Sequence, residues 1–227
     1  MSWFSSRAPQ LPNSLAGAGS APKAGAALAT LEPGEEPEVH SSLALATLFR
    51  EVGPLGKLQV LDLGPAVGSN VEFLSQFGCK LYIEDLYAAL AAHRRQEDRQ
   101  GVSAAPFAEL LPFPESARFD AVFAWDLFNY LSRKELAGLA HYLKPFCRPG
   151  ALVFALVSIL KQMPAAPIRF KILDRERLVY ERQTAEESPC PRYPPAELAD
   201  LMKGFRLDRS FLLRHGIQEN LFTRLAD

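Results

Sequence analysis

The hydrophobic and polar positions of the chain form short apolar runs that alternate with amphipathic segments. Apolar residues recur at helical spacing from Ser41 to Val52, where Ser41 or Ser42 is expected to cap a helix that ends at Gly53-Pro54. The same pattern predicts strands at 59–63, 80–83, 121–124 and 151–158, separated by helices at 69–77, 86–96 and 132–143. This alternation predicts an α/β fold with a mostly parallel sheet and right-handed crossovers.

After residue 158 the alternation gives way to shorter elements. Segments 169–173 and 178–182 flank a polar turn and predict a β-hairpin inserted beside the sheet. A short helix is expected at 194–202, closing at Gly204. Strands at 205–213 and 220–225, joined through His215-Gly216, complete the predicted domain.

Residues 1–38 have a different composition, rich in Ala, Gly, Pro and Ser and without apolar periodicity. Such a segment buries too little apolar surface to order itself, so it is predicted to be a flexible tail preceding one domain at 39–227. The tail also lacks the continuous apolar stretch of a secretory signal. Its Trp3 and Phe4 either dock on a protein partner or are stray aromatic residues of an unstructured end.

Charge, cysteine spacing and the length of the apolar runs give no indication of nucleic-acid binding, a metal site or a membrane span. Lys and Arg number 25 against 26 Asp and Glu, so no global field draws in nucleic acid or an anionic membrane. Cys79, Cys147 and Cys190 lie far apart without metal-ligand spacing, which indicates no metal site and a reducing, cytoplasmic setting. The longest apolar run, 151–160, has half of the roughly twenty residues that a membrane helix needs.

Candidate ligand-binding residues follow the predicted strands, since ligands of open parallel sheets bind at the carboxyl ends of the strands. The first strand leads through Asp62 into the turn Gly64-Pro65-Ala66-Val67-Gly68 and then a helix. Glycine allows the backbone to turn sharply and approach a ligand, and the helix start presents free N–H groups. The second strand leads to Asp85, an acid placed where it can accept hydrogen bonds from both hydroxyls of a ribose.

These ordered segments resemble the class I S-adenosylmethionine-dependent methyltransferases. Asp62, Gly64 and Gly68 fall on the acid and the glycine-rich loop of that family, and Asp85 falls on its ribose-binding acid. Residues 110–122 and 143–151 resemble the segments leading into the family's fourth and fifth strands. The resemblance spans most of residues 57–227. It implies a Rossmann-like, seven-stranded, mostly parallel sheet with an antiparallel last strand and helices on both faces.

The resemblance implies S-adenosylmethionine as the cofactor. Its binding residues are expected to be Asp62, Gly64, Pro65, Ala66, Gly68, Asn70, Asp85, Leu86 and Asp126. The sequence departs from the family at Ala66, which replaces the middle glycine, and only Glu109 stands near the place of the acid that contacts adenine. A dinucleotide-binding loop would need glycine at positions 66 and 69, so NAD fits less well.

Two further candidates follow the fourth strand. Asp126 is expected either to orient the methyl acceptor, to act as a base, or to cap the next helix. Tyr130 is expected to line the pocket beside the sulfonium or to serve in packing. Asp126-Leu127-Phe128-Asn129 stands where the Asn-Pro-Pro-Tyr signature would be, which argues against an adenine N-methylase.

The resulting hypothesis is S-adenosylmethionine-dependent methyl transfer to an unidentified small-molecule or protein acceptor. The cationic donor is already activated, so orientation and desolvation supply much of the rate. The hairpin near 169–182 and the loop 189–193 are expected to cover the acceptor side. The alternative is a non-catalytic, methyltransferase-like binding or assembly subunit, which Pro65-Ala66 favours and the pair of Asp62 and Asp85 opposes.

Overall fold

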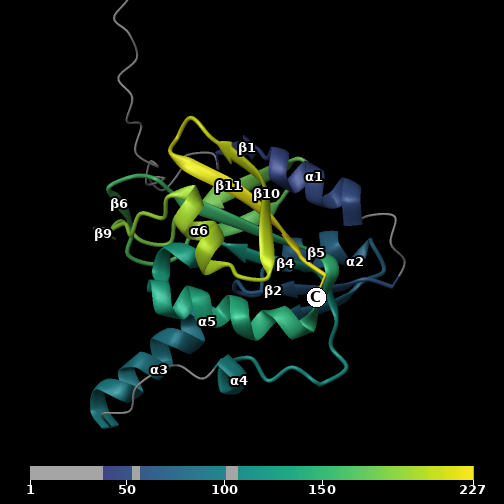
Figure 1. Cartoon of the computed structure of the whole chain (residues 1–227). Coiled ribbons are helices and arrows are strands. Elements are labelled where there is room, and N and C mark those ends of the chain that lie inside the picture. Colours follow the sequence, from purple (N-terminus) through teal and green to yellow (C-terminus); the bar gives the residue numbers. More distant parts are fainter. Residues whose placement is uncertain (1–37, 53–56, 101–106, 227) are drawn as a thin grey trace, which may run out of the picture.

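The structure is a computed structural model that describes residues 38–52, 57–100 and 107–226. The predicted tail up to residue 37, with Trp3 and Phe4, and the Gly53-Pro54 end of the first helix lie outside the described residues. Figure 1 shows the arrangement of the elements.

A six-stranded mixed sheet forms the centre of the molecule, in the order β10-β11-β5-β4-β2-β3. Its parallel strands are β2 (Gln59–Asp62), β3 (Lys80–Ile83), β4 (Phe119–Trp125) and β5 (Cys147–Ser158). The last strand, β11 (Ile217–Arg224), is antiparallel both to β5 and to β10 (Phe205–Leu212). The antiparallel last strand is as expected, but the described residues place six strands in this sheet where seven were expected.

Helices cover both faces of the sheet (Figure 1). One face carries α3 (Leu86–Gln100), α4 (Phe107–Leu110), α5 (Arg133–Leu143) and α6 (Pro195–Leu201). The other carries α1 (Leu43–Val52) and α2 (Gly68–Ser75). Each layer buries its own apolar cluster against the sheet, which is why the strands between them are apolar on both sides.

Local sequence determines where helices α1 and α5 begin. The hydroxyl of Ser42 accepts a hydrogen bond from the Leu45 N–H at 3.1 Å, so Ser42 is the cap of α1. Ser132 and Glu135 form a reciprocal capping box at the start of α5. Short 3₁₀ helices lie at Leu127–Tyr130 and Lys144–Phe146.

The predicted hairpin consists of β7 (Arg169–Ile172) and β8 (Arg177–Glu181). It belongs to a second sheet, ordered β1-β8-β7, because β1 (Val39–Ser41) pairs antiparallel with β8. Sequence periodicity did not predict β1, which is only three residues long. A further short pair, β6 (Gln162–Pro164) and β9 (Glu187–Pro189), flanks the hairpin.

None of the described helices is long and apolar enough to cross a membrane. Within residues 38–52, 57–100 and 107–226, no group of three or more His, Cys, Asp or Glu side chains is arranged to hold a metal ion.

Candidate functional site

A cavity of about 180 Å³ lies at the carboxyl ends of β2, β3 and β4. The chain leaves β2 toward β3 on one side and returns to β4 on the other, so this edge is the topological switch point of the sheet. The cavity brings together the glycine turn, Asp85 and Asp126, three features that lie far apart in the sequence. Its walls are formed by Leu63, Gly64, Pro65, Val67, Asn70, Asp85, Tyr87, Ala124, Trp125, Asp126, Leu127, Ala166, Pro167, Ile168, Phe170 and Gln183.

The side chain of Asp62 holds the glycine turn through a hydrogen bond. Its Oδ1 accepts hydrogen bonds from the Gly64 N–H at 2.9 Å and from the indole Nε1–H of Trp125 at 2.6 Å. Burial raises the pKa of Asp62 to about 6, although both hydrogen bonds oppose the shift. Asp62 is 2% exposed and does not itself line the cavity.

The turn leads into α2, whose first N–H groups receive no side-chain cap from Val67. Gly64, Pro65 and Val67 line the cavity, whereas Ala66 and Gly68 are exposed and do not. The start of α2 therefore offers uncapped backbone donors beside the cavity, as an anion-binding helix start does.

Asn70, one of the residues expected to bind the cofactor, lines the cavity, but both polar atoms of its side-chain amide form hydrogen bonds to the hairpin. Its Nδ2 donates to the carbonyl of Phe170 at 2.9 Å, and its Oδ1 accepts from the Ile172 N–H at 2.7 Å. The side chain is 2% exposed. Asn70 thus extends the edge of β7 and fixes the hairpin against α2.

Asp85 and Leu86 follow β3 but have different surroundings. The Asp85 carboxyl is exposed at the cavity wall, and its Oδ1 accepts a hydrogen bond from the Ala88 N–H at 3.0 Å. Capping α3 in this way leaves the carboxylate with further acceptor capacity toward the cavity. Leu86 is fully buried in the core and is not a wall residue.

Asp126 follows β4 and is 4% exposed. Its Oδ2 accepts a hydrogen bond from the Ile168 N–H at 2.9 Å, while it makes no capping bond to the following 3₁₀ helix. Burial raises the pKa of the Asp126 carboxyl to about 7. The carboxylate is therefore at the cavity wall, but one of its oxygens is engaged by the backbone.

Residues 164–168, called the wall segment below, are held by two tyrosines as well. The Tyr130 hydroxyl lies 3.1 Å from the Pro164 carbonyl and 2.9 Å from that of Ala166, and the Tyr87 hydroxyl lies 3.2 Å from that of Ala165. Burial raises the pKa of the Tyr130 phenol, so it remains a hydrogen-bond donor at neutral pH. Tyr130 does not line the cavity, and it acts there through the wall segment.

Trp125 is the principal wall residue that the sequence analysis did not single out. It has a φ of 48°, stacks on Phe170 with an interplanar angle of 6°, and contacts the open side of Gly64. The only sequence signal was a bulky aromatic residue at the end of a strand adjacent to a glycine turn. Tyr87 and Gln183, also wall residues, gave no distinguishing signal.

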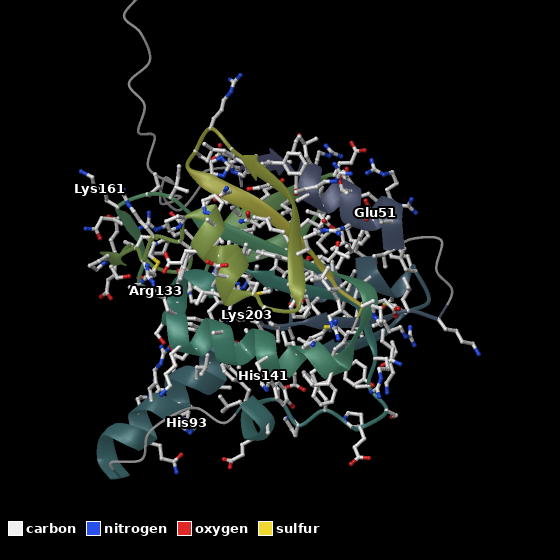
Figure 2. All side chains as sticks on the ribbon, viewed as in Figure 1. Glu51, His93, Arg133, His141, Lys161 and Lys203 are labelled. Atoms are coloured by element: carbon white, nitrogen blue, oxygen red, sulfur yellow. The ribbon has the colours of Figure 1, made fainter. Side chains whose placement is uncertain are left out.

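The hairpin and the loop that were expected to cover the acceptor side differ in their position relative to the cavity. Phe170 and Gln183, from the hairpin and just beyond it, line the cavity, but residues 189–193 do not. In that loop the Tyr193 hydroxyl instead donates to the Leu131 carbonyl at 2.5 Å. Glu109 is exposed on α4 and does not line the cavity. Figure 2 shows His93 and His141 on α3 and α5, and neither lines the cavity.

Comparison with protein families gives one match. Residues 61–155 match a family described as a methyltransferase domain. The matched span runs from β2 into β5 and includes the glycine turn, Asp85 and Asp126. No curated protein sequence matches the chain.

The chain is similar to several solved structures at low sequence identity. An S-adenosylmethionine-dependent methyltransferase from Mesorhizobium loti is 16% identical, with a TM-score of 0.51 over 80% of this chain and 96% of that one. A 1,6-didemethyltoxoflavin-N1-methyltransferase from Burkholderia thailandensis, with bound S-adenosylhomocysteine, is 20% identical, with a TM-score of 0.47 over 81% and 77%. A magnesium protoporphyrin IX methyltransferase from Synechocystis PCC 6803 is 14% identical, with a TM-score of 0.45 over 79% and 76%.

Proposed function

Because residues 61–155 match a methyltransferase-domain family, we propose that the protein transfers the methyl group of S-adenosylmethionine to an acceptor through the cavity at the ends of β2, β3 and β4. The observation that carries this proposal is the convergence of the Gly64 turn and Asp85 on one cavity at the switch point of the sheet. Neither feature would suffice alone, since a glycine turn and a helix cap are both common structural devices.

The residues around the cavity suit the parts of such a donor. Asp85 would accept hydrogen bonds from the ribose hydroxyls, and the N–H groups at the start of α2 would face the donor's carboxylate. Tyr87 and Phe170 bring aromatic rings to the cavity wall, and such rings attract a cationic sulfonium. Pro65, Ala66, Gly68, Asn70 and Leu86 would support these contacts through the backbone and the packing of the turn.

In methyl transfer the main task of the protein is to position the donor and the acceptor. The donor supplies an activated methyl group, which the acceptor's lone pair attacks as the bond to sulfur breaks. Asp126 and Asp62 would place negative charge near the sulfonium, and burial of the site would keep water from competing. Tyr130 would hold the wall segment and thus the shape of the site. Asp126 could serve as a base through Oδ1, while its Oδ2 accepts the hydrogen bond from the Ile168 N–H.

The proposal also covers the domain organisation, the type of acceptor and the cellular location of the protein. Residues 39–227 would form one domain whose Rossmann-like sheet bears the site, and the preceding residues would bind a protein partner. The acceptor would be a small molecule or a protein. The three cysteines are free thiols, which suits the cytoplasm.

The second candidate function is a non-catalytic binding or assembly subunit. The observation that favours it is the position of Trp125, whose indole occupies the space in front of Gly64 where a donor would approach. The exposed, cavity-facing carboxyl of Asp85 favours the enzyme instead, because a cap alone does not require that it face a cavity.

Calorimetry with S-adenosylmethionine and S-adenosylhomocysteine tests the proposal. Wild type is expected to bind both, and Asp85→Ala is expected to weaken binding at least tenfold. Asp85→Asn retains the α3 cap and separates a lost ribose contact from a frayed helix. Glu84→Ala, which removes the neighbouring carboxyl, is the matched control and should bind as wild type does. Absence of binding to wild type at millimolar donor would reject the enzyme.

A further inference from the structure

Gly64 is required by a close approach and not by its backbone conformation. Its φ does not lie in the left-handed region, so another residue could adopt its backbone angles. A Cβ built on Gly64, however, would lie 2.7 Å from Cδ1 and 3.1 Å from Nε1 of Trp125. The space that this glycine leaves open is therefore occupied by an indole ring from the end of the neighbouring strand.

The indole is held there by polar and aromatic contacts. Its Nε1–H donates to Oδ1 of Asp62 at 2.6 Å, a charge-assisted bond when Asp62 is ionised. Its ring lies between Phe123 and Phe170, with centroids 5.1 Å and 5.5 Å away. Trp125 is 5% exposed. These contacts define a seat for the indole, formed by Gly64, Asp62 and the two phenyl rings.

The backbone of Trp125 is strained in this position. Its φ of 48° is in a region that bulky side chains rarely adopt. Strained residues of this kind persist where the surroundings hold them, and they are concentrated at binding sites and switches. The contacts of the seat therefore hold Trp125 in an unfavourable backbone conformation.

The cavity that remains beside the seated indole is small. Its volume is about 180 Å³, whereas pockets for drug-sized ligands have roughly 300–1,000 Å³. A nucleoside-sized donor therefore needs additional space. Asp126, Tyr130 and Tyr87 hold the wall segment through hydrogen bonds. The indole of Trp125 is held by its hydrogen bond to Asp62.

We propose that Trp125 is the gate residue of the donor site: the indole and S-adenosylmethionine compete for the space in front of Gly64, and donor binding requires the indole to leave its seat. This inference rests on the proposed function and adds to it the residue that sets donor affinity. When most molecules are in the seated state, the apparent affinity is lowered by the fraction that is open. Variants that weaken the seat consequently bind the donor more tightly.

The test combines calorimetry and fluorescence. In a Trp3→Phe background, Trp125 is the only indole of the chain, so its emission reports its surroundings directly. S-adenosylmethionine is expected to shift that emission as the ring leaves the two phenyl groups and Asp62. Trp125→Ala empties the seat and is expected to bind the donor about tenfold more tightly than wild type, the equivalent of losing one hydrogen bond to a charged group.

Trp125→Phe is the second variant, in case Trp125→Ala fails to fold, because it keeps an aromatic ring at this position while removing the bond to Asp62 and reducing the size of the side chain. It is expected to tighten donor binding several-fold. Tyr130→Phe loosens the wall segment without touching the seat and is the matched comparison, expected to change affinity less than either Trp125 variant. If Trp125→Phe binds the donor no more tightly than wild type does, the gate is rejected, even if the donor shifts the emission of Trp125.

The outcomes separate this inference from the proposed function. Donor binding to wild type without tightening in the Trp125 variants rejects the gate and leaves the methyltransferase intact. Binding only to the Trp125 variants supports the competition between indole and donor and rejects the enzyme, because wild type then does not take up the donor. Absence of binding to every variant rejects the proposed function and the gate with it.

Discussion

The carboxylate of Asp126 accepts a hydrogen bond from the backbone N–H of Ile168, with 2.9 Å between Oδ2 and N. This bond joins the end of β4 to the wall segment, two parts of the chain separated by about forty residues. The residue that the sequence suggested as a base or an orienting group is thus also an anchor of the cavity wall. Its chemistry and its structural role depend on the same protonation equilibrium.

Replacing Asp126 with Asn should change how stability depends on pH. Burial raises the pKa of Asp126 to about 7 and that of Asp62 to about 6, above the value of about 3.9 in an unfolded chain. The folded state therefore holds protons that the unfolded state has released, and stability falls as pH rises from about 4 toward 7. Asn keeps an acceptor for Ile168 but does not titrate. Urea unfolding at pH 5 and pH 8 should show a loss smaller than that of wild type by on the order of 2 kcal/mol.

The control for this measurement is Asp200→Asn, which changes an exposed acid on α6. It should retain the pH dependence of wild type. A profile for Asp126→Asn that overlays the wild-type profile would mean that Asp126 is ionised in the folded state throughout this range.

Asn70→Ala should destabilise the protein by about 2–4 kcal/mol. The change leaves the Phe170 carbonyl and the Ile172 N–H buried without their partner, and an unmet buried polar group costs about 1–3 kcal/mol. Urea unfolding measures the loss, and hydrogen exchange should show faster exchange at Ile172. Ser69→Ala, at an exposed position of the same helix, should have little effect. Equal stabilities of the two variants would contradict the role of Asn70.

Gly64→Ala should destabilise the protein by about 1–3 kcal/mol, because the new methyl group collides with the Trp125 indole. Gly68→Ala is the matched control, since a Cβ there meets no atom within 4 Å. In a Trp125→Ala background the cost of Gly64→Ala should largely disappear, which a double-mutant cycle in urea measures. Additive effects would show that the two residues do not share the space.

Tyr130→Phe should loosen the wall segment while leaving the fold intact. The variant removes the hydroxyl that bonds to the carbonyls of Pro164 and Ala166, at a cost of about 1 kcal/mol. Limited proteolysis should cut more rapidly within residues 160–168, and adding Tyr87→Phe should increase the rate further. Unchanged cleavage of both variants would show that other contacts hold the segment.

Much of the fold could be predicted from the sequence because its signals are local. Strand β3 agrees with its predicted bounds at both ends, and β2, α2, α5 and the hairpin agree within two or three residues. Apolar periodicity, glycine turns and capping residues such as Ser42 act over a few neighbouring residues. The placement of the glycine turn and Asp85 at one edge of the sheet also followed, since parallel strands end on the same side.

The seventh strand and the pairing of β1 could not be derived from the same signals. The expectation of seven strands came from the resemblance to a family. The described residues place six strands in the central sheet. Strand β1 has only three residues, and its pairing with β8 across more than a hundred positions depends on where the hairpin packs. Short edge pairings are determined by the assembled tertiary structure.

The sequence by itself determined which residues stand at the strand ends: Asp62, Gly64, Asp85 and Asp126. Only the tertiary structure decided how they are used: Asp62 binds the indole of Trp125, Asn70 binds the edge of β7, and Asp126 binds the wall segment. The physical reason is that a buried polar group must find a hydrogen-bond partner, and that partner is selected by proximity in space. Local sequence sets which donors and acceptors are available, and packing sets which of them meet.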